Sequence, residues 1–247
     1  MSELDNIQTL YKNSGYFGTA QRIVFWVNTF IAISAIFVSR SVLEWLIWGQ
    51  IVILILGVGL SVIDNGVFWY RAERARRRDS IQDAFSISLA VEHSTGYYSN
   101  EQKPSIEKYA LNLFESALYS KSISMKMLLT SSIESFLALL VLIIVCRYAE
   151  NINTVLIIAQ SVFSVSVFEN TIMLLIFCNR VNKVYDDFYM QFVTIGIGAS
   201  NQIPILLSIA VEYEAIKAHY KVRLSEKVFR KHHDALLHEW DSLCQQI

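Results

Sequence analysis

The chain has 247 residues, 53% of them hydrophobic and 17% charged, with 21 lysines and arginines against 22 aspartates and glutamates. This balance excludes a polybasic, nucleic-acid-coating protein, and three cysteines in a chain of this length argue against a disulfide framework. Charged residues are scarcer than the roughly 25% of soluble domains, and long uncharged runs separate them, which indicates a membrane protein.

Two uncharged runs near the N-terminus predict a first membrane-spanning hairpin. Residues 23–39 and 45–63 contain no charged side chain, and a short tip between Arg40 and Glu44 separates them. Each run approaches the roughly 20 apolar residues that a spanning helix needs. Residues 1–22 are mostly polar and are expected outside the membrane.

Two further runs predict a second hairpin. Residues 127–146 contain one charged side chain, Glu134, and residues 151–179 contain one, Glu169. The alternative is a pair of buried hairpins in a soluble bundle, but core helices rarely reach this length and evenness of apolarity. The sequence therefore predicts a mainly α-helical membrane protein with four spans.

The positions of lysine and arginine predict the orientation of the spans. Of the 21 basic residues, only Arg40 and Arg147 lie at the two tips. Because basic residues are retained on the cytoplasmic side, both termini and the segment between the two hairpins are expected to be cytoplasmic. The predicted segments are 1–22 (cytoplasmic), 23–69 (first hairpin), 70–126 (cytoplasmic), 127–179 (second hairpin) and 180–247 (cytoplasmic).

Residues 70–126 and 180–247 are expected to form a small cytoplasmic α(+β) domain. A 3.6-residue apolar period predicts a helix from about Ser105 to Lys126, continuous with the third span.

An uncharged stretch, residues 188–211, interrupts the C-terminal segment. A fifth span there would carry the following basic residues to the outside, against the charge bias. We expect instead a strand at Phe192–Ile197, followed by a helix that starts near Ser200 or Asn201 with Pro204 in its first turn. This helix is expected to extend to about Trp240 with a break.

Several polar side chains within the spans are candidates to line a pore. Asp64, Glu134 and Glu169 all fall within roughly 10–15 Å of the cytoplasmic end of a span. Carboxylates are costly there unless they face water or a partner, and around the axis of an oligomer they would favour cations. Asn170 and Ser166 lie at a similar depth. The alternative, pairing with headgroups or nearby basic residues, is favoured for Asp64.

Basic and aromatic residues of the cytoplasmic segments are candidates to bind a phosphate-bearing ligand. For the arginine cluster after the second span, the alternatives are setting the topology and touching anionic lipid. For the C-terminal segment, the alternative is a solvated helix face. The candidates are Arg74, Arg77, Arg78, Tyr97, Tyr98, Asn100, Lys217, Lys221, Arg223 and Lys227.

No motif indicates an enzyme. The chain has no Walker loop, GxGxxG, HExxH, CxxC pair or GxSxG. His233 and His238 are five residues apart, which does not place both on one helical face. We therefore expect no catalytic residue, no metal and no cofactor.

Short motifs give a resemblance to a known family. They are Ile81-Gln82-Asp83-Ala84-Phe85, Gly96-Tyr97-Tyr98-Ser99-Asn100, Asn112-Leu113-Phe114-Glu115 and Glu212-Tyr213-Glu214-Ala215. With these motifs the chain resembles the SMODS-associated four-transmembrane effectors, which are encoded beside nucleotidyltransferases in anti-phage defence loci, and the Hailong-type membrane effector.

The resemblance implies a homo-oligomeric inner-membrane channel, for which a homotetramer is the first expectation. It would be gated by a nucleotide or single-stranded DNA oligomer that a partner nucleotidyltransferase makes, and it would depolarise the membrane when open. The residues alone leave open a non-conducting membrane scaffold or sensor that recruits a soluble partner, and a small transporter.

Overall fold

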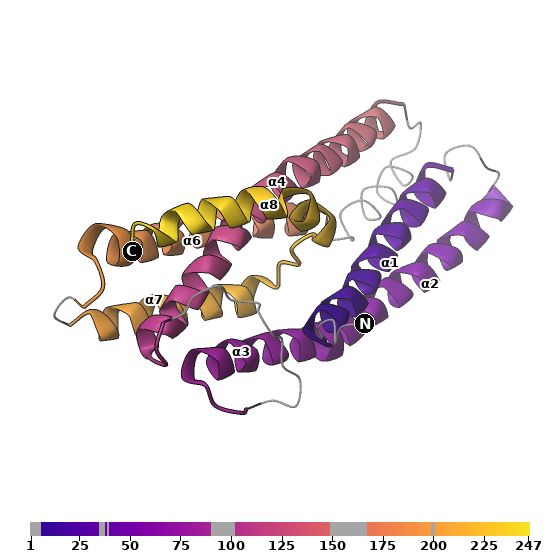
Figure 1. Cartoon of the computed structure of the whole chain (residues 1–247). Helices are drawn as coiled ribbons and strands as arrows, with labels where there is room; N and C mark the ends of the chain where they lie inside the picture. Colours follow the sequence, from indigo (N-terminus) through magenta and orange to yellow (C-terminus); the bar gives the residue numbers. More distant parts are fainter. Residues whose placement is uncertain (1–5, 35–37, 39, 90–101, 149–166, 199–200) are drawn as a thin grey trace. The chain divides into compact units, whose positions relative to one another are not determined.

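The computed structural model describes residues 6–34, 38, 40–89, 102–148, 167–198 and 201–247, and the regular secondary structure of these residues is helical, with no strand (Figure 1). The mainly α-helical prediction is confirmed for this part of the chain. The elements are α1 (Asn6–Ser34), α2 (Arg40–Ile63), the π-helix η1 (Asp64–Phe68), α3 (Trp69–Phe85), α4 (Ile106–Tyr148), α6 (Val167–Tyr189), the π-helix η2 (Met190–Ile195), α7 (Gln202–Tyr220) and α8 (Glu226–Cys244).

The chain divides into two compact units. The core unit comprises Met1–Thr9, Arg71–Leu129 and Met173–Ile247, and the hairpin unit comprises Leu10–Tyr70 and Thr130–Ile172. The long helix α4 supplies residues to both, as the predicted continuity of the Ser105 helix with the third span requires.

In the hairpin unit, α1 and α2 form an antiparallel pair. Phe17 stacks on Phe68 with 4.7 Å between ring centroids. A Cβ atom at Gly57 would lie only 3.2 Å from Val24 Cγ1, so the two helices approach closely at this glycine. Arg40 begins α2, so the residues expected to form the hairpin tip are the first turn of a helix instead.

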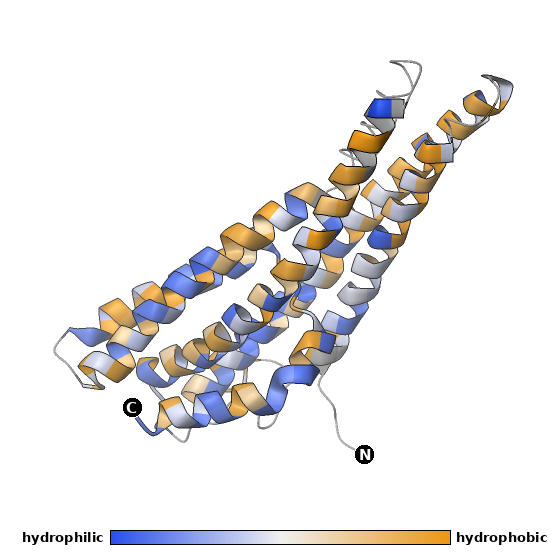
Figure 2. Ribbon diagram, turned by 90° about the horizontal axis from the view of Figure 1, so that it is seen from above, coloured by the Kyte–Doolittle hydropathy of each residue, from blue (hydrophilic) through white to orange (hydrophobic). Residues whose placement is uncertain are grey.

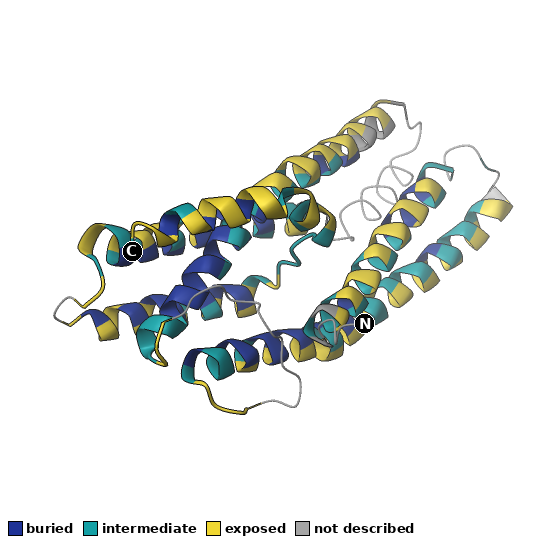
Figure 3. Ribbon diagram, viewed as in Figure 1, coloured by how far each residue is buried: buried dark blue, intermediate teal, exposed yellow. Residues whose placement is uncertain are grey.

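Among the residues that the structure describes, two helical stretches are long and apolar enough to cross a membrane, Ser41–Phe85 and Ile106–Leu140. Only 6% and 22% of the residues in their most apolar windows are buried, unlike the core helix of a soluble protein. Exposed apolar side chains run along α2, from Trp45 (79% exposed) to Val62 (65%) (Figures 2 and 3). The fourth predicted span overlaps α6, but its residues 151–166 lie outside the described residues.

The core unit is organised around Phe114 of α4. Its ring lies 5.3–5.9 Å from the rings of Tyr185, Phe188, Phe192 and Trp240, which belong to α6, η2 and α8. Buried aliphatic residues of α7 complete this core. The apolar period that predicted the Ser105 helix is thus the face that packs against three other helices.

The strand predicted at Phe192–Ile197 is wrong, because the chain is helical up to the end of η2. Phe188 and Phe192 are four residues apart, are both fully buried and stack with centroids 6.2 Å apart. Their burial requires helical spacing, which outweighs the strand preference of the β-branched residues that follow. The helix ends at Gly196, whose φ of 85° suits glycine.

Helix α7 begins where the sequence placed it, with Pro204 in the first turn. Gln202 closes the turn before it: its Nε2 donates to the carbonyl oxygens of Gln191 (2.9 Å) and Gly196 (3.0 Å), and its Oε1 accepts from Gly198 N (2.9 Å). The predicted break separates α7 from α8, whose N-cap is Ser225.

Candidate functional site

Asp64, a predicted pore residue, is buried at the junction of α2 and η1. Its Oδ1 accepts a 2.7 Å hydrogen bond from Ser14 Oγ on α1. π-Helical turns are rare and occur frequently at functional sites. The buried carboxylate at the start of η1 therefore makes Asp64 a candidate functional residue. The contact gives Asp64 a protein partner within the hairpin unit.

Polar residues recur at heptad spacing along the α1–α2 pair. Asn28 lies fourteen residues beyond Ser14, and Gln50 lies fourteen residues before Asp64, and all four are buried. Gly57, where α2 comes closest to α1, lies seven residues from both Gln50 and Asp64. Residues at heptad spacing lie on one face of a helix and can all contact a neighbouring helix. The buried interface between α1 and α2 therefore contains polar side chains at intervals, although the hairpin is mostly apolar.

Hydroxyl groups join α4 to the start of α6. Thr171 Oγ1 lies 2.6 Å from Ser131 Oγ and 2.7 Å from Ser135 Oγ. Such hydroxyl contacts hold helices together where no water competes. They fix the α4 and α6 segments of the hairpin unit side by side.

The other described pore candidates are partly or fully exposed. The Glu134 side chain is 28% exposed, and its Oε2 lies 3.7 Å from Arg22 Nη2 on α1. Glu169 and Asn170 are exposed in the first turn of α6. Ser166 lies outside the described residues. The structure thus brings Glu134 to a cation and does not bring the candidates together within one chain.

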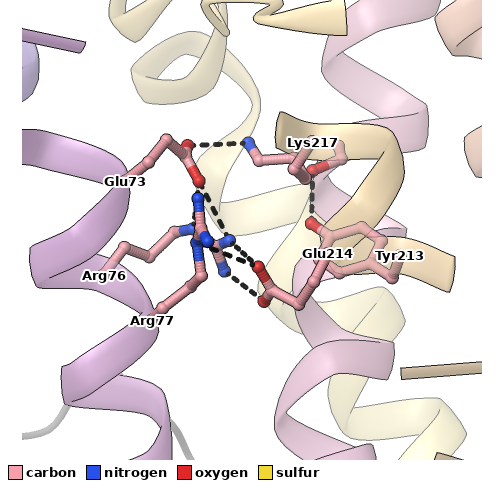
Figure 4. Close-up of polar contacts among 7 residues, drawn as sticks. Glu73, Arg76, Arg77, Tyr213, Glu214 and Lys217 are labelled. Carbon is pink, nitrogen blue, oxygen red and sulfur yellow. Dashed lines mark hydrogen bonds and ion pairs between the residues drawn. The ribbon is translucent and has the colours of Figure 1, made fainter. Parts of the chain in front are cut away.

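In the core unit, a buried charge cluster joins α3 to α7 (Figure 4). The guanidinium of Arg76 donates from Nε and Nη2 to Glu73 Oε2 (3.1 and 3.0 Å). It also donates from Nη1 and Nη2 to Glu214 Oε1 and Oε2 (3.1 and 2.6 Å). This two-pronged contact with Glu214 is the strongest geometry for an arginine–carboxylate pair.

Two more cations complete the cluster. Lys217 Nζ lies 3.8 Å from Glu73 Oε1, and Arg77 Nε lies 3.5 Å from Glu214 Oε2. Three cations therefore face two carboxylates. Burial lowers the pKa of Lys217, against the opposing effect of Glu73.

Two tyrosines border the charge cluster. The hydroxyl of Tyr213 on α7 lies 2.9 Å from Ser120 Oγ on α4, so α4 is tied to the same helix. Burial raises the pKa of Tyr213 well above its usual value. Burial and the nearby Glu214 carboxylate raise the pKa of Tyr109 to about 12.

The arginine candidates on α3 divide between two faces. Arg77 contributes to the charge cluster, whereas Arg74 and Arg78 are exposed, as is Arg71 one turn earlier. Within the described residues no acidic side chain pairs with these three. They form an exposed basic stripe, Arg71, Arg74 and Arg78, on the turns that follow the first hairpin.

The candidates at the C-terminal end are dispersed. Lys217 is buried in the charge cluster, while Lys221 and Lys227 are exposed. Arg223 is partly buried, and this burial lowers its pKa. Tyr97, Tyr98 and Asn100 lie outside the described residues.

Sequence reasoning missed the two carboxylates of the charge cluster. Glu73 precedes Arg76 by three residues, and Glu214 precedes Lys217 by three, so each pair shares a helix face. That spacing was visible, but it is equally typical of an exposed ion pair. Only the packing of α3 on α7 buries both pairs together.

In the described ranges no group of three histidine, cysteine, aspartate or glutamate side chains is placed to hold a metal ion. Comparison of the chain with models of protein families, with curated proteins and with solved structures finds no match.

Proposed function

We propose that the chain is a multi-pass inner-membrane protein with four spans and cytoplasmic termini, which assembles into a homo-oligomeric ion channel. The two long, apolar and largely unburied helical stretches support the membrane location. A soluble protein would leave side chains such as Trp45 and Trp48 in water, whereas bilayer interfaces favour tryptophan.

The channel proposal rests on one observation. Carboxylate side chains are exposed on helices whose other exposed side chains are mostly apolar. Glu169 is exposed and Glu134 is partly exposed, and their helices carry exposed aliphatic side chains such as Ile133 and Ile172. A carboxylate facing lipid is costly, so such positions are normally covered by protein or water. Further copies around an axis would cover them and form an acidic cation pathway.

The core unit is proposed to control this pathway. Helix α3 follows directly from α2 and η1, and α4 supplies residues to both units, so both hairpins connect covalently to the core unit. The charge cluster holds α3 to α7 inside that unit. An anionic ligand at the exposed stripe of Arg71, Arg74 and Arg78 would bind to α3 itself, and it would shift the populations of two states by its differential affinity.

The resemblance described above supplies the ligand class and the setting. A nucleotide or single-stranded DNA oligomer made by a partner nucleotidyltransferase would bind the core unit, and channel opening would depolarise an infected cell. No cofactor takes part in this proposal.

Ion flux from proteoliposomes tests the proposal. Purified full-length protein is reconstituted with entrapped K⁺, and flux is measured with and without cyclic dinucleotides and deoxyadenosine oligomers. We expect flux that one ligand class changes at least tenfold. Arg74→Gln with Arg78→Gln should weaken the ligand response, while Lys231→Gln, exposed on α8, should not.

Intact oligomers without flux under any ligand would overturn the channel proposal. Stable capture of a soluble partner by such silent oligomers would favour the scaffold or sensor alternative. If flux is observed but no anionic ligand changes it, the channel proposal stands and the proposed ligand-binding role of α3 is wrong.

A further inference from the structure

An ion pair joins the two predicted hairpins within the hairpin unit. Arg22 on α1 and Glu134 on α4 approach to 3.7 Å between Nη2 and Oε2. Helix α1 belongs to the first predicted hairpin and α4 to the second, and both residues belong to the hairpin unit. The uncharged run that predicts the first span begins one residue after Arg22, which would place this arginine at the edge of the membrane.

Contacts within the hairpin unit place Arg22 deeper than this edge. A Cβ atom at Gly57 would touch Val24, two residues after Arg22, so Arg22 lies within about 3 Å of the level of Gly57 along the helix axis. Gly57 is seventeen residues from Arg40 and thirteen residues from Tyr70, about 25 and 20 Å of continuous helix. Since the hydrocarbon core of a bilayer is about 30 Å thick, a hairpin that crosses it would hold Arg22 well inside.

The surface around the ion pair is apolar. Ile23 and Ile133, the neighbours of the two charged residues, are 59% and 53% exposed, and Val58 on α2 is 65% exposed. An exposed ion pair in water contributes little to stability, whereas in hydrocarbon each charge is costly unless an opposite charge lies beside it. The Arg22 side chain is 65% exposed and the Glu134 side chain 28%, so the pair lies on the surface that further copies or water would cover.

We propose that Arg22 is the intramembrane counter-ion of Glu134 and positions its carboxylate in the cation pathway. This inference rests on the proposed function, because it assigns a positioning residue to the same acidic position. The guanidinium of Arg22 offsets the charge of the carboxylate and holds its side chain toward α1. Glu134 therefore acts in selectivity as one half of a pair, and its removal leaves a cation behind.

Thermal unfolding of the full-length chain in lipid nanodiscs tests the pair without reference to conduction. Arg22→Gln and Glu134→Gln each leave one unpaired charge in hydrocarbon, and each should lower Tm by at least about 6 °C. The chain carrying both substitutions leaves no charge there and should be more stable than either single variant.

An ion pair on α8 supplies the matched control. Arg230 donates to Glu226 four residues earlier, and their side chains are 72% and 40% exposed in the core unit. Because this pair is proposed to face water, Arg230→Gln and Glu226→Gln should each change Tm by less than about 3 °C.

The reversal potential across a KCl gradient tests the effect of the pair on selectivity. Glu134→Gln leaves Arg22 as an unpaired cation beside the pathway, so the reversal potential should move toward that of Cl⁻. Adding Arg22→Gln removes this cation and should move the reversal potential back toward that of K⁺. A purely structural role of Arg22 would not produce this recovery.

Three results would overturn the inference: single substitutions as mild as the controls, a double variant no more stable than the single variants, or no recovery of the reversal potential. If Glu134→Gln prevents assembly, the exchanged pair Arg22→Glu with Glu134→Arg should restore it, and continued failure would also count against the pair. Coupled stability in chains that pass no current would contradict only the channel, and current without coupling would contradict only the ion pair.

Discussion

At the scale of single residues, the charge cluster predicts an asymmetry between removing an anion and removing a cation. Glu73→Gln leaves Arg76 and Lys217 buried with Glu214 as the remaining carboxylate, and we expect a loss of about 3–5 kcal/mol. Lys217→Met leaves two carboxylates facing two arginines and removes a charge that burial already disfavours, so we expect a change within about 1 kcal/mol. Thermal unfolding in mild detergent measures both, and equal losses would contradict the role of charge balance.

Buried tyrosines predict a loss of stability at alkaline pH. Burial raises the pKa of Tyr109 and Tyr185 to about 12, so the folded state keeps their phenolic protons when the unfolded state has lost them. Between the ordinary pKa near 10 and about 12 the folded state therefore binds more protons, and stability falls as pH rises. Absorbance at 295 nm should show tyrosines that ionise late, and Tyr109→Phe should remove one; an unchanged late phase would contradict this.

At the scale of elements, helical periodicity was a reliable guide wherever one face of a helix is buried. It predicted the helix from Ser105, because the buried face repeats every 3.6 residues. The start of α7 was predicted instead from Pro204, which suits the first turn of a helix. The strand predicted at Phe192–Ile197 was wrong, because local β-branched composition was given more weight than the spacing of two phenylalanines. The first tip was predicted at Arg40–Glu44 because charge marks it, but these residues begin α2, and arginine and glutamate both have good helix propensity.

The close approach of α1 and α2 predicts that one glycine is restricted while another is not. Gly57→Leu would force side-chain atoms against Val24, whereas nothing lies within 4 Å of a Cβ atom at Gly59. Both substitutions gain similar helix propensity. We expect Gly57→Leu to cost about 1–3 kcal/mol relative to Gly59→Leu in thermal unfolding. Equal stability of the two variants would show that the helices separate there without loss.

At the scale of the whole molecule, the sequence predicted which residues are polar but not which ones meet. Asp64 and Ser14 are 50 residues apart, and Arg76 and Glu214 are 138 apart. No local sequence pattern predicts a contact between residues so far apart in the chain. The pore and ligand candidates were therefore identified by type and depth, while their partners required the packing of helices.

Reporter fusions test the predicted orientation of the chain. Because nearly all basic residues lie on one side of the four predicted spans, green fluorescent protein fused after Ile247 should fluoresce and alkaline phosphatase at the same site should be inactive. A fusion near Glu150, at the predicted second tip, should give the reverse pattern. An active phosphatase at the C-terminus would contradict the four-span topology.

The central claim is that polar and acidic positions on otherwise apolar helices form a cation pathway between copies of the chain. Current through a planar bilayer containing the purified oligomer, recorded across a KCl gradient, tests it most directly. The account predicts a reversal potential close to that of K⁺, moved toward zero by Glu134→Gln with Glu169→Gln. An intact oligomer that passes no current, or one whose reversal potential follows Cl⁻, would contradict it.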